Sequence, residues 1–205
     1  MMTISTWLSN NYIEVFGAIT GMIYVFLEIR QTIWLWPVGI ITSTVYIWVF
    51  FTGKLYADMS LQVYYLVISC LGWWWWTRRM GDLEIKGRRD EEKKRLFVTR
   101  LKLKAGLILS AVFVFLYFVM WLVLSKLTDS PVPEWDSFIT SLSIIATWML
   151  ARKIYEHWYL WIVVNLTASV LFLTRALYPT VILYIVYGIM SVVGLKEWRK
   201  TIKSS

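Results

Sequence analysis

Residue types that build catalytic and metal sites are nearly missing from this 205-residue chain, which contains one cysteine and one histidine. Cys70 cannot form an internal disulfide bond, and one cysteine with one histidine cannot assemble the usual nucleophilic or metal-binding sets. No Walker-type phosphate-binding loop is present either, so direct drive by ATP is not expected. We therefore expect a protein that is not an enzyme and holds no metal or cofactor. We expect His157, at a predicted helix start, to be solvated.

Charged residues are scarce as well. They make up 17% of the chain, against about a quarter in ordinary soluble domains. Hydrophobic residues make up 59%, and 14 residues are tryptophan. A soluble domain of this length buries only about 70% of the surface that its unfolded chain exposes, which is too little to hide so much apolar surface. The composition argues against a soluble enzyme, a disordered chain or a disulfide scaffold, and favours a multi-pass membrane protein.

Seven mostly apolar segments predict seven transmembrane helices and an all-α fold, because helices pair every backbone group in lipid without closing a barrel. We expect these helices at Tyr12–Ile29, Trp34–Thr52, Met59–Trp76, Ala105–Leu124, Trp135–Ala151, Trp158–Ala176 and Thr180–Gly194. Tryptophans near the span ends, including Trp34, Trp135 and Trp198, are expected to anchor the helices at the bilayer surfaces.

The charges that are present predict the orientation of the chain. If the C-terminus and the basic segment 77–104 share one side, 18 lysine and arginine residues lie there and three lie on the other side. Membrane proteins keep these residues in the cytoplasm, so we expect the N-terminus outside and the C-terminus inside. Segment 77–104 then determines topology, with lipid or nucleic-acid binding as a less favoured interpretation. Its later half is expected to extend the fourth helix. We expect no nucleic-acid partner, because the basic residues interrupt apolar spans and form no single patch.

An internal repeat appears when the sequence is shifted by 122 residues. The shift aligns Arg30 with Arg152 and Trp36 with Trp158, and it aligns the set Tyr65, Ser69, Gly72 and Trp76 with Tyr187, Ser191, Gly194 and Trp198. Both halves carry an arginine after their first span, so they point the same way. Span 105–124 must then be a linker. We predict a single transporter domain, 1–205, with a 3+1+3 parallel repeat of segments 12–76 and 135–198 and a substrate site between them.

Polar residues inside the spans fall on single helix faces at spacings of three and four. One face holds Asp58, Gln62, Tyr65 and Ser69, and the others hold Tyr184, Tyr187 and Ser191, then Trp158, Trp161 and Asn165, then Trp36, Gly39 and Ser43. This mixture of aromatic rings, amides and hydroxyls fits a neutral or cationic heteroaromatic glycoside better than an anion or a metal ion. Since the spans show no chain of buried acids, facilitated movement is the simplest mechanism.

Several motifs resemble the PnuC nicotinamide riboside transporters. They are Trp36-Pro37-Val38-Gly39-Ile40, Gly53-Lys54-Leu55-Tyr56-Ala57-Asp58, Gln62-Val63-Tyr64-Tyr65, Gly72-Trp73-Trp74-Trp75-Trp76, Trp161-Ile162-Val163-Val164-Asn165 and Gly194-Leu195-Lys196-Glu197-Trp198. The resemblance covers nearly the whole chain. It implies a SWEET-related fold, a trimer in the bacterial inner membrane, and facilitated diffusion of nicotinamide riboside for NAD biosynthesis. It also implies that a cytoplasmic kinase traps the imported vitamin by phosphorylating it.

The resemblance also implies which residues bind the substrate. Carried onto this sequence they are Gln62, Tyr65, Trp161, Asn165, Tyr184, Tyr187 and, less closely, Ser43. The polar faces add Trp36 as a ring that faces the substrate, and Asp58 and Trp158 as candidate gates. Two alternatives stay open: the same fold carrying thiamine or another aromatic vitamin, and a membrane receptor or scaffold that transports nothing and uses segment 77–104 to contact a partner.

Overall fold

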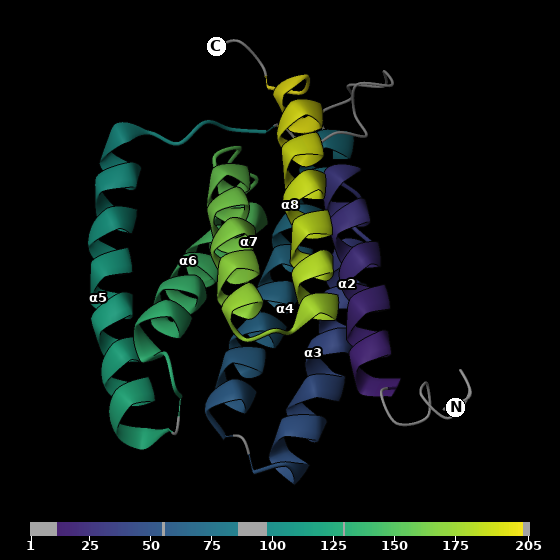
Figure 1. The fold of residues 1–205 in the computed structure, drawn as a ribbon. Coiled ribbons are helices and arrows are strands. Elements are labelled where there is room, and N and C mark those ends of the chain that lie inside the picture. Colours follow the sequence, from purple (N-terminus) through teal and green to yellow (C-terminus); the bar gives the residue numbers. More distant parts are fainter. Residues whose placement is uncertain (1–11, 55, 86–97, 129, 203–205) are drawn as a thin grey trace.

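The computed structural model describes residues 12–54, 56–85, 98–128 and 130–202, and seven α-helices account for most of them (Figure 1). In chain order they are α2 (Tyr12–Ile29), α3 (Leu35–Thr52), α4 (Tyr56–Ile85), α5 (Leu103–Leu127), α6 (Pro133–Ala151), α7 (His157–Thr174) and α8 (Tyr178–Arg199). By length and composition α3, α5, α7 and α8 could each cross a membrane, and α2 holds a shorter apolar stretch, Val15–Ile29. Within the described ranges, the predicted all-α class with seven helices is confirmed.

The largest departure from the predicted bounds lies around the basic segment. Helix α4 continues to Ile85, well past the predicted end at Trp76. We expect from the sequence that the later half of the segment extends the next helix, and this is wrong. Residues 98–102 are not helical, and α5 begins at Leu103. The backbone of Thr99 is instead paired with the turn between α6 and α7. It donates to the Lys153 carbonyl at 3.0 Å and accepts from the Tyr155 N–H at 2.9 Å. Residues 86–97 of the segment lie outside the described residues.

Helices that are equivalent in the two halves of the sequence pack in equivalent ways. Helix α3 packs on α4, and its equivalent α7 packs on α8. Helix α2 packs on α3, and its equivalent α6 packs on α7. Between the halves, α2 packs on α8 and α6 packs on α4. Backbone conformation follows the same rule. The non-glycine residues with positive φ in the described ranges are Gln31 and Lys153, both at 55°, and Lys54 and Ala176, at 59° and 56°. Each pair is separated by the 122-residue shift.

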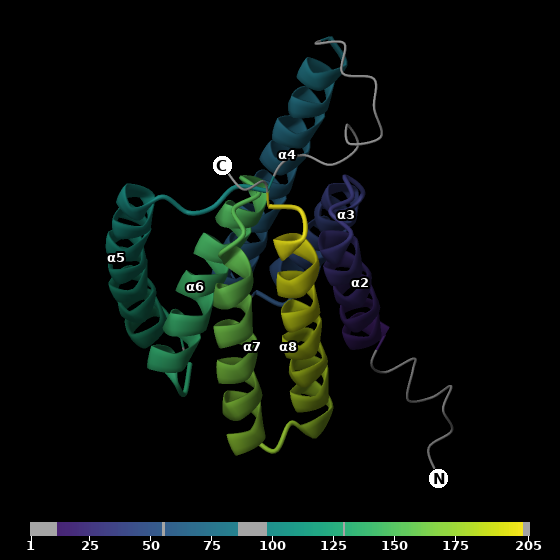
Figure 2. The same cartoon turned by 90° about the horizontal axis from the view of Figure 1, so that it is seen from above.

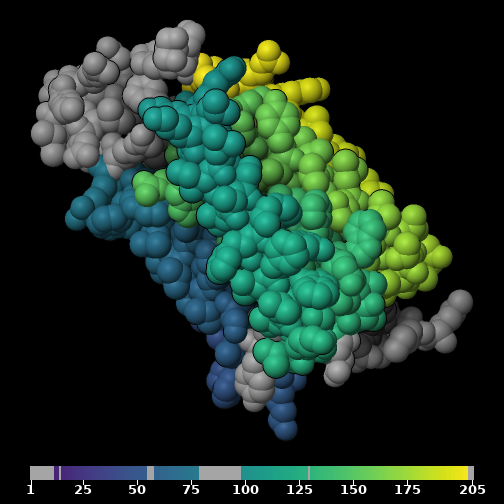
Figure 3. Space-filling model, turned by 90° about the vertical axis from the view of Figure 1, so that its left-hand side faces the viewer, coloured from purple at the N-terminus to yellow at the C-terminus, as the bar shows by residue number. Residues whose placement is uncertain are grey.

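Helix α5 stands at the edge of the bundle and packs only on α6 among the described helices (Figures 1 and 2). None of its side chains is buried. The space-filling view shows this helix, in teal, on the outside of the molecule (Figure 3). The other six helices therefore build the interior.

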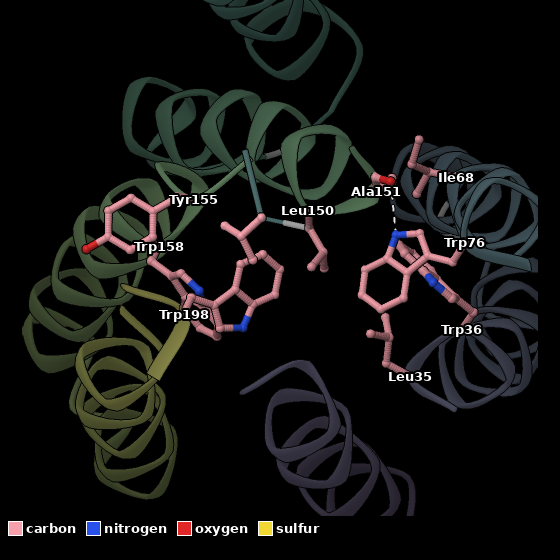
Figure 4. Packing of buried hydrophobic residues seen from close by; sticks show 10 residues of the cluster. Leu35, Trp36, Ile68, Trp76, Leu150, Ala151, Tyr155, Trp158 and Trp198 are labelled. Carbon is pink, nitrogen blue, oxygen red and sulfur yellow. Dashed lines mark hydrogen bonds between the residues drawn. The ribbon is translucent and has the colours of Figure 1, made fainter. Parts of the chain in front are cut away.

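The core gathers at the end of the bundle where α8 ends, which we call the C-terminal end. Trp36 packs on Gly72 and Trp158 packs on Gly194 so closely that a methyl group at either glycine would collide with the indole ring. A tryptophan one helical turn beyond each glycine meets the same ring edge to face. The centroids of Trp36 and Trp76 are 5.3 Å apart, and those of Trp158 and Trp198 are 5.7 Å apart. Figure 4 shows these two ring pairs on either side of Leu150.

The two ring pairs also tie the halves of the chain together. The Trp76 indole N–H donates to the Ala151 carbonyl at 3.1 Å, and the Trp198 indole N–H donates to the Glu28 carbonyl at 3.0 Å. Trp198 is completely buried, so the expectation that it anchors the protein at the bilayer surface is wrong. Trp34 and Trp135, which we expected to be anchors too, are exposed.

Candidate functional site

One cavity of about 380 Å³ lies between the helices, and every helix except α5 contributes to its lining. It runs along α2 from Glu28, near the C-terminal end, to Gly17, which is about 16 Å at 1.5 Å per residue. Its volume is that of a small-molecule site. No lysine or arginine is among the described residues that line it. No described group of histidine, cysteine and acidic residues could hold a metal ion.

Most of the residues predicted to bind substrate meet in this cavity. The lining includes Ser43 of α3, Gln62 and Tyr65 of α4, Trp161 and Asn165 of α7, and Tyr184 and Tyr187 of α8, together with the candidate gate Trp158. The cavity does not reach Trp36, which is fully buried between Gly72 and Trp76. It does not reach Asp58 either, which is exposed in the first turn of α4. The roles predicted for these residues stay predictions.

Two amides provide donors and acceptors in the cavity. Asn165 donates an N–H to the Ser191 hydroxyl at 3.2 Å, and that hydroxyl donates to the Tyr187 carbonyl at 2.8 Å. This chain fixes the orientation of the Asn165 amide and leaves its oxygen available to a ligand. Gln62 is half-buried one helical turn before Tyr65, and an amide there could both donate and accept.

Aromatic rings in the cavity are held in place by packing. Tyr184 stacks on Phe172 with centroids 5.3 Å apart and meets Tyr187 at 6.0 Å, nearly perpendicular. The Tyr187 hydroxyl lies directly against Gly21 of α2, where any larger residue would collide with it. Rings fixed in this way suit a flat ligand, because they can stack on it without losing further conformational freedom.

Three buried polar groups that line the cavity have no hydrogen-bond partner within the described part of the protein. They are the Thr42 hydroxyl and the indole N–H groups of Trp158 and Trp161. A buried donor left unpaired costs about 1–3 kcal/mol, so each such group calls for an explanation. Because their residues line the cavity, oxygen atoms of a bound ligand are candidate partners for these groups.

The parts of the lining contributed by α2 and α6 were not predicted from the sequence. Helix α2 presents Gly17, Gly21, Tyr24 and Glu28, and α6 presents Ser143 and Thr147. The α2 residues are spaced by four, three and four, which is the same signal that identified the face on α4. The signal is weaker here because two of the four residues are glycines.

The interior also holds an acid–base pair. Glu28 and His157 are 2% and 0% exposed, and the Nε2 of His157 lies 3.0 Å from Oε1 of Glu28. Our expectation that His157 is solvated is wrong. The rings of Trp158 and Trp198 cover it at centroid distances of 4.7 and 4.6 Å. Glu28 lines the cavity, and it is the one acidic residue among the described lining residues.

With the site described, comparisons with known proteins identify the family. Residues 11–200 match the model of the family described as nicotinamide mononucleotide transporter. The chain belongs to this transporter family. Its relatives are named as transporters and not as enzymes. The apolar helices and the family together identify a multi-pass membrane transporter.

Individual relatives of this transporter carry different names. The nicotinamide riboside transporter PnuC of Escherichia coli (strain K12) is 29% identical over an alignment 203 residues long, which covers 92% of this chain and 85% of the relative. The riboflavin/roseoflavin transporter RibM of Streptomyces davaonensis is 24% identical, with 90% and 83% covered. The crystal structure of the vitamin B3 transporter PnuC shares the fold, with a TM-score of 0.74, 24% identity, and coverage of 96% of this chain and 84% of that one.

Proposed function

We propose that this transporter imports nicotinamide riboside across the bacterial inner membrane by facilitated diffusion. The cavity carries the proposal, because it joins fixed aromatic rings to amides and unpaired hydroxyl and indole donors. A pyridinium ring can stack on such rings, and ribose hydroxyls can pair with the amides and donors.

The same lining argues against a nucleotide as cargo. A phosphate group is normally held by arginine or lysine, and neither is among the described residues that line the cavity, which include Glu28. The expected difference between a riboside, which the cavity accepts, and a nucleotide, which it does not, also supports trapping by a cytoplasmic kinase. Phosphorylation would turn the imported riboside into an anion that the cavity no longer accepts, so uptake would proceed in one direction without direct coupling to ATP.

Alternating access between two parallel repeats completes the proposed mechanism. The equivalent packing of the helix pairs and the matched positive-φ residues support a 3+1+3 arrangement with α5 as the linker. With the C-terminal end in the cytoplasm, as the distribution of basic residues predicts, the tryptophan pairs would close the cavity on that side. From the resemblance to PnuC we further propose a homotrimer surrounded by membrane lipids.

A melting screen of the purified transporter would separate the candidate cargoes, since a ligand that binds the native state raises its apparent stability. We expect nicotinamide riboside to raise the melting temperature more than nicotinamide mononucleotide, thiamine or riboflavin at equal concentration. A larger rise with thiamine or riboflavin would favour the alternative of another aromatic vitamin. A scaffold that transports nothing predicts no rise with any of the four.

A further inference from the structure

The buried pair of Glu28 and His157 has a hydrogen-bond arrangement that fixes its protons. The Nδ1 of His157 lies 2.7 Å from the Ile154 carbonyl oxygen, which can only accept, so Nδ1 carries a hydrogen. A second hydrogen must then lie between Nε2 of His157 and Oε1 of Glu28, 3.0 Å apart, because otherwise two lone pairs would face each other. Whichever atom holds this proton, the net charge of the pair is zero.

The pair also breaks the symmetry of the two halves. At the 122-residue shift Glu28 corresponds to Leu150 and His157 to Leu35, and both leucines are fully buried in the core. One half therefore has two buried leucines where the other has a polar pair, of which Glu28 lines the cavity. Replacing a buried ion pair by apolar residues of similar volume is often neutral or stabilising, so stability alone does not account for the pair.

The other titratable groups among the described lining residues are tyrosines. Tyr24 precedes Glu28 by one turn in α2, and the lining also includes Tyr46 of α3, Tyr65 of α4, and Tyr184 and Tyr187 of α8. In the turn between α6 and α7, the ammonium group of Lys153 lies 4.1 Å from the centre of the Trp76 ring and 3.4 Å from Oε1 of Gln31. Glu28 is the one carboxyl group among the described residues that line the cavity.

We propose that Glu28 makes the cavity selective for cationic over neutral substrates: when a cation binds, the proton that Glu28 shares with His157 is released to the aqueous medium. In the empty cavity the carboxylate is buried, so it needs the shared proton, because an uncompensated buried charge is strongly unfavourable. A cationic ring in the cavity takes over this compensation. A neutral ligand of the same shape cannot, so it leaves the proton in place and gains nothing from Glu28. This inference rests on the proposed function, since nicotinamide riboside is a pyridinium cation.

Calorimetry with two forms of one ligand tests the proposal. Nicotinamide riboside is cationic, and its dihydro form has nearly the same shape but no charge. For the wild-type transporter we expect the cation to release up to about one proton on binding, measured from the dependence of the binding enthalpy on the buffer, and the dihydro form to release none. By linkage the dissociation constant of the cation should fall by up to about tenfold per unit rise in pH over the range in which the empty cavity keeps the shared proton, while that of the dihydro form stays flat.

A matched pair of variants assigns the proton to Glu28. In Glu28→Gln we expect binding of the cation to weaken by about tenfold or more, binding of the dihydro form to change less than about twofold, and the pH slope to vanish. Glu197→Gln makes the same chemical change at an exposed site on α8, outside the cavity, and should leave both ligands and the slope unchanged.

The outcomes separate this inference from the proposed function. A cation that binds the wild type without releasing a proton would overturn the inference alone, and this measurement needs no variant to fold. Equal weakening of both ligands in Glu28→Gln would also overturn it, since that result means a structural role. Absence of binding by both forms to the wild type would overturn the proposed function, and the inference with it.

Discussion

Replacing Thr42 by valine should raise stability and lower ligand affinity at the same time. The Thr42 hydroxyl is buried, lines the cavity and lacks a partner within the described part of the protein. Valine has nearly the same branched shape and is also restricted at χ1, but it has no hydroxyl. The substitution therefore removes one unpaired polar group with little change in packing.

The two expected effects have opposite signs and similar sizes. An unpaired buried hydroxyl costs about 1–3 kcal/mol, so its removal should raise the free energy of unfolding by about 1 kcal/mol. For a chain of this length, that is a rise of about 2–4 °C in melting temperature. If the hydroxyl pairs with the substrate, its loss should weaken binding by about 1.4 kcal/mol, or about tenfold in dissociation constant.

Thr44→Val in the same helix provides the control. The Thr44 hydroxyl is exposed and donates to the Ile40 carbonyl at 2.8 Å, so removing it should change both quantities little. Thermal unfolding of the two purified variants, with and without nicotinamide riboside, measures both effects in one experiment. If Thr42→Val melts below the wild type and binds ligand with unchanged affinity, the hydroxyl is not an unpaired group awaiting a ligand, and this reasoning is refuted.

Two further substitutions test the site and the core. Asn165→Leu should weaken binding of nicotinamide riboside by about 2 kcal/mol, or roughly thirtyfold, while the protein stays folded. Unchanged binding by calorimetry would remove Asn165 from the site. Gly194→Ala should lower the melting temperature, because the added methyl group collides with the Trp158 indole. Gly106→Ala in α5, where the nearest atom would be 3.6 Å away, should raise it slightly through the higher helix propensity of alanine. Equal melting temperatures for the two alanine variants would contradict the packing described here.

Much of the fold could be predicted because the bilayer sets the length and apolar composition of each spanning helix, whatever tertiary contacts the helix makes. The C-terminal end of α2, at Ile29, agrees with the prediction, and the bounds of α3 differ from it by a single residue. The error at α4 arose because the charged residues after Trp76 were taken to mark the end of the helix, whereas a helix can continue into water once it has left the apolar layer. The non-helical stretch before α5 depends on the pairing of Thr99 with Lys153, two residues far apart in the chain.

The site was predictable where one helix face carries several polar residues. Spacing alone placed Gln62 and Tyr65 together, and it also placed Trp161 with Asn165, because residues three or four apart share a face. Spacing did not show that the Trp36 ring would pack on Gly72 and not line the cavity. The pair of Glu28 and His157 could not be found in this way, because its members are 129 residues apart. Each lies near a helix end, where a polar residue ordinarily meets water.

Counterflow of labelled nicotinamide riboside into proteoliposomes that contain only this protein tests the central claim most directly. We predict saturable accumulation of label that is faster than in empty liposomes and needs no ATP. Accumulation no faster than in empty liposomes, from protein that is folded and inserted, would contradict the account.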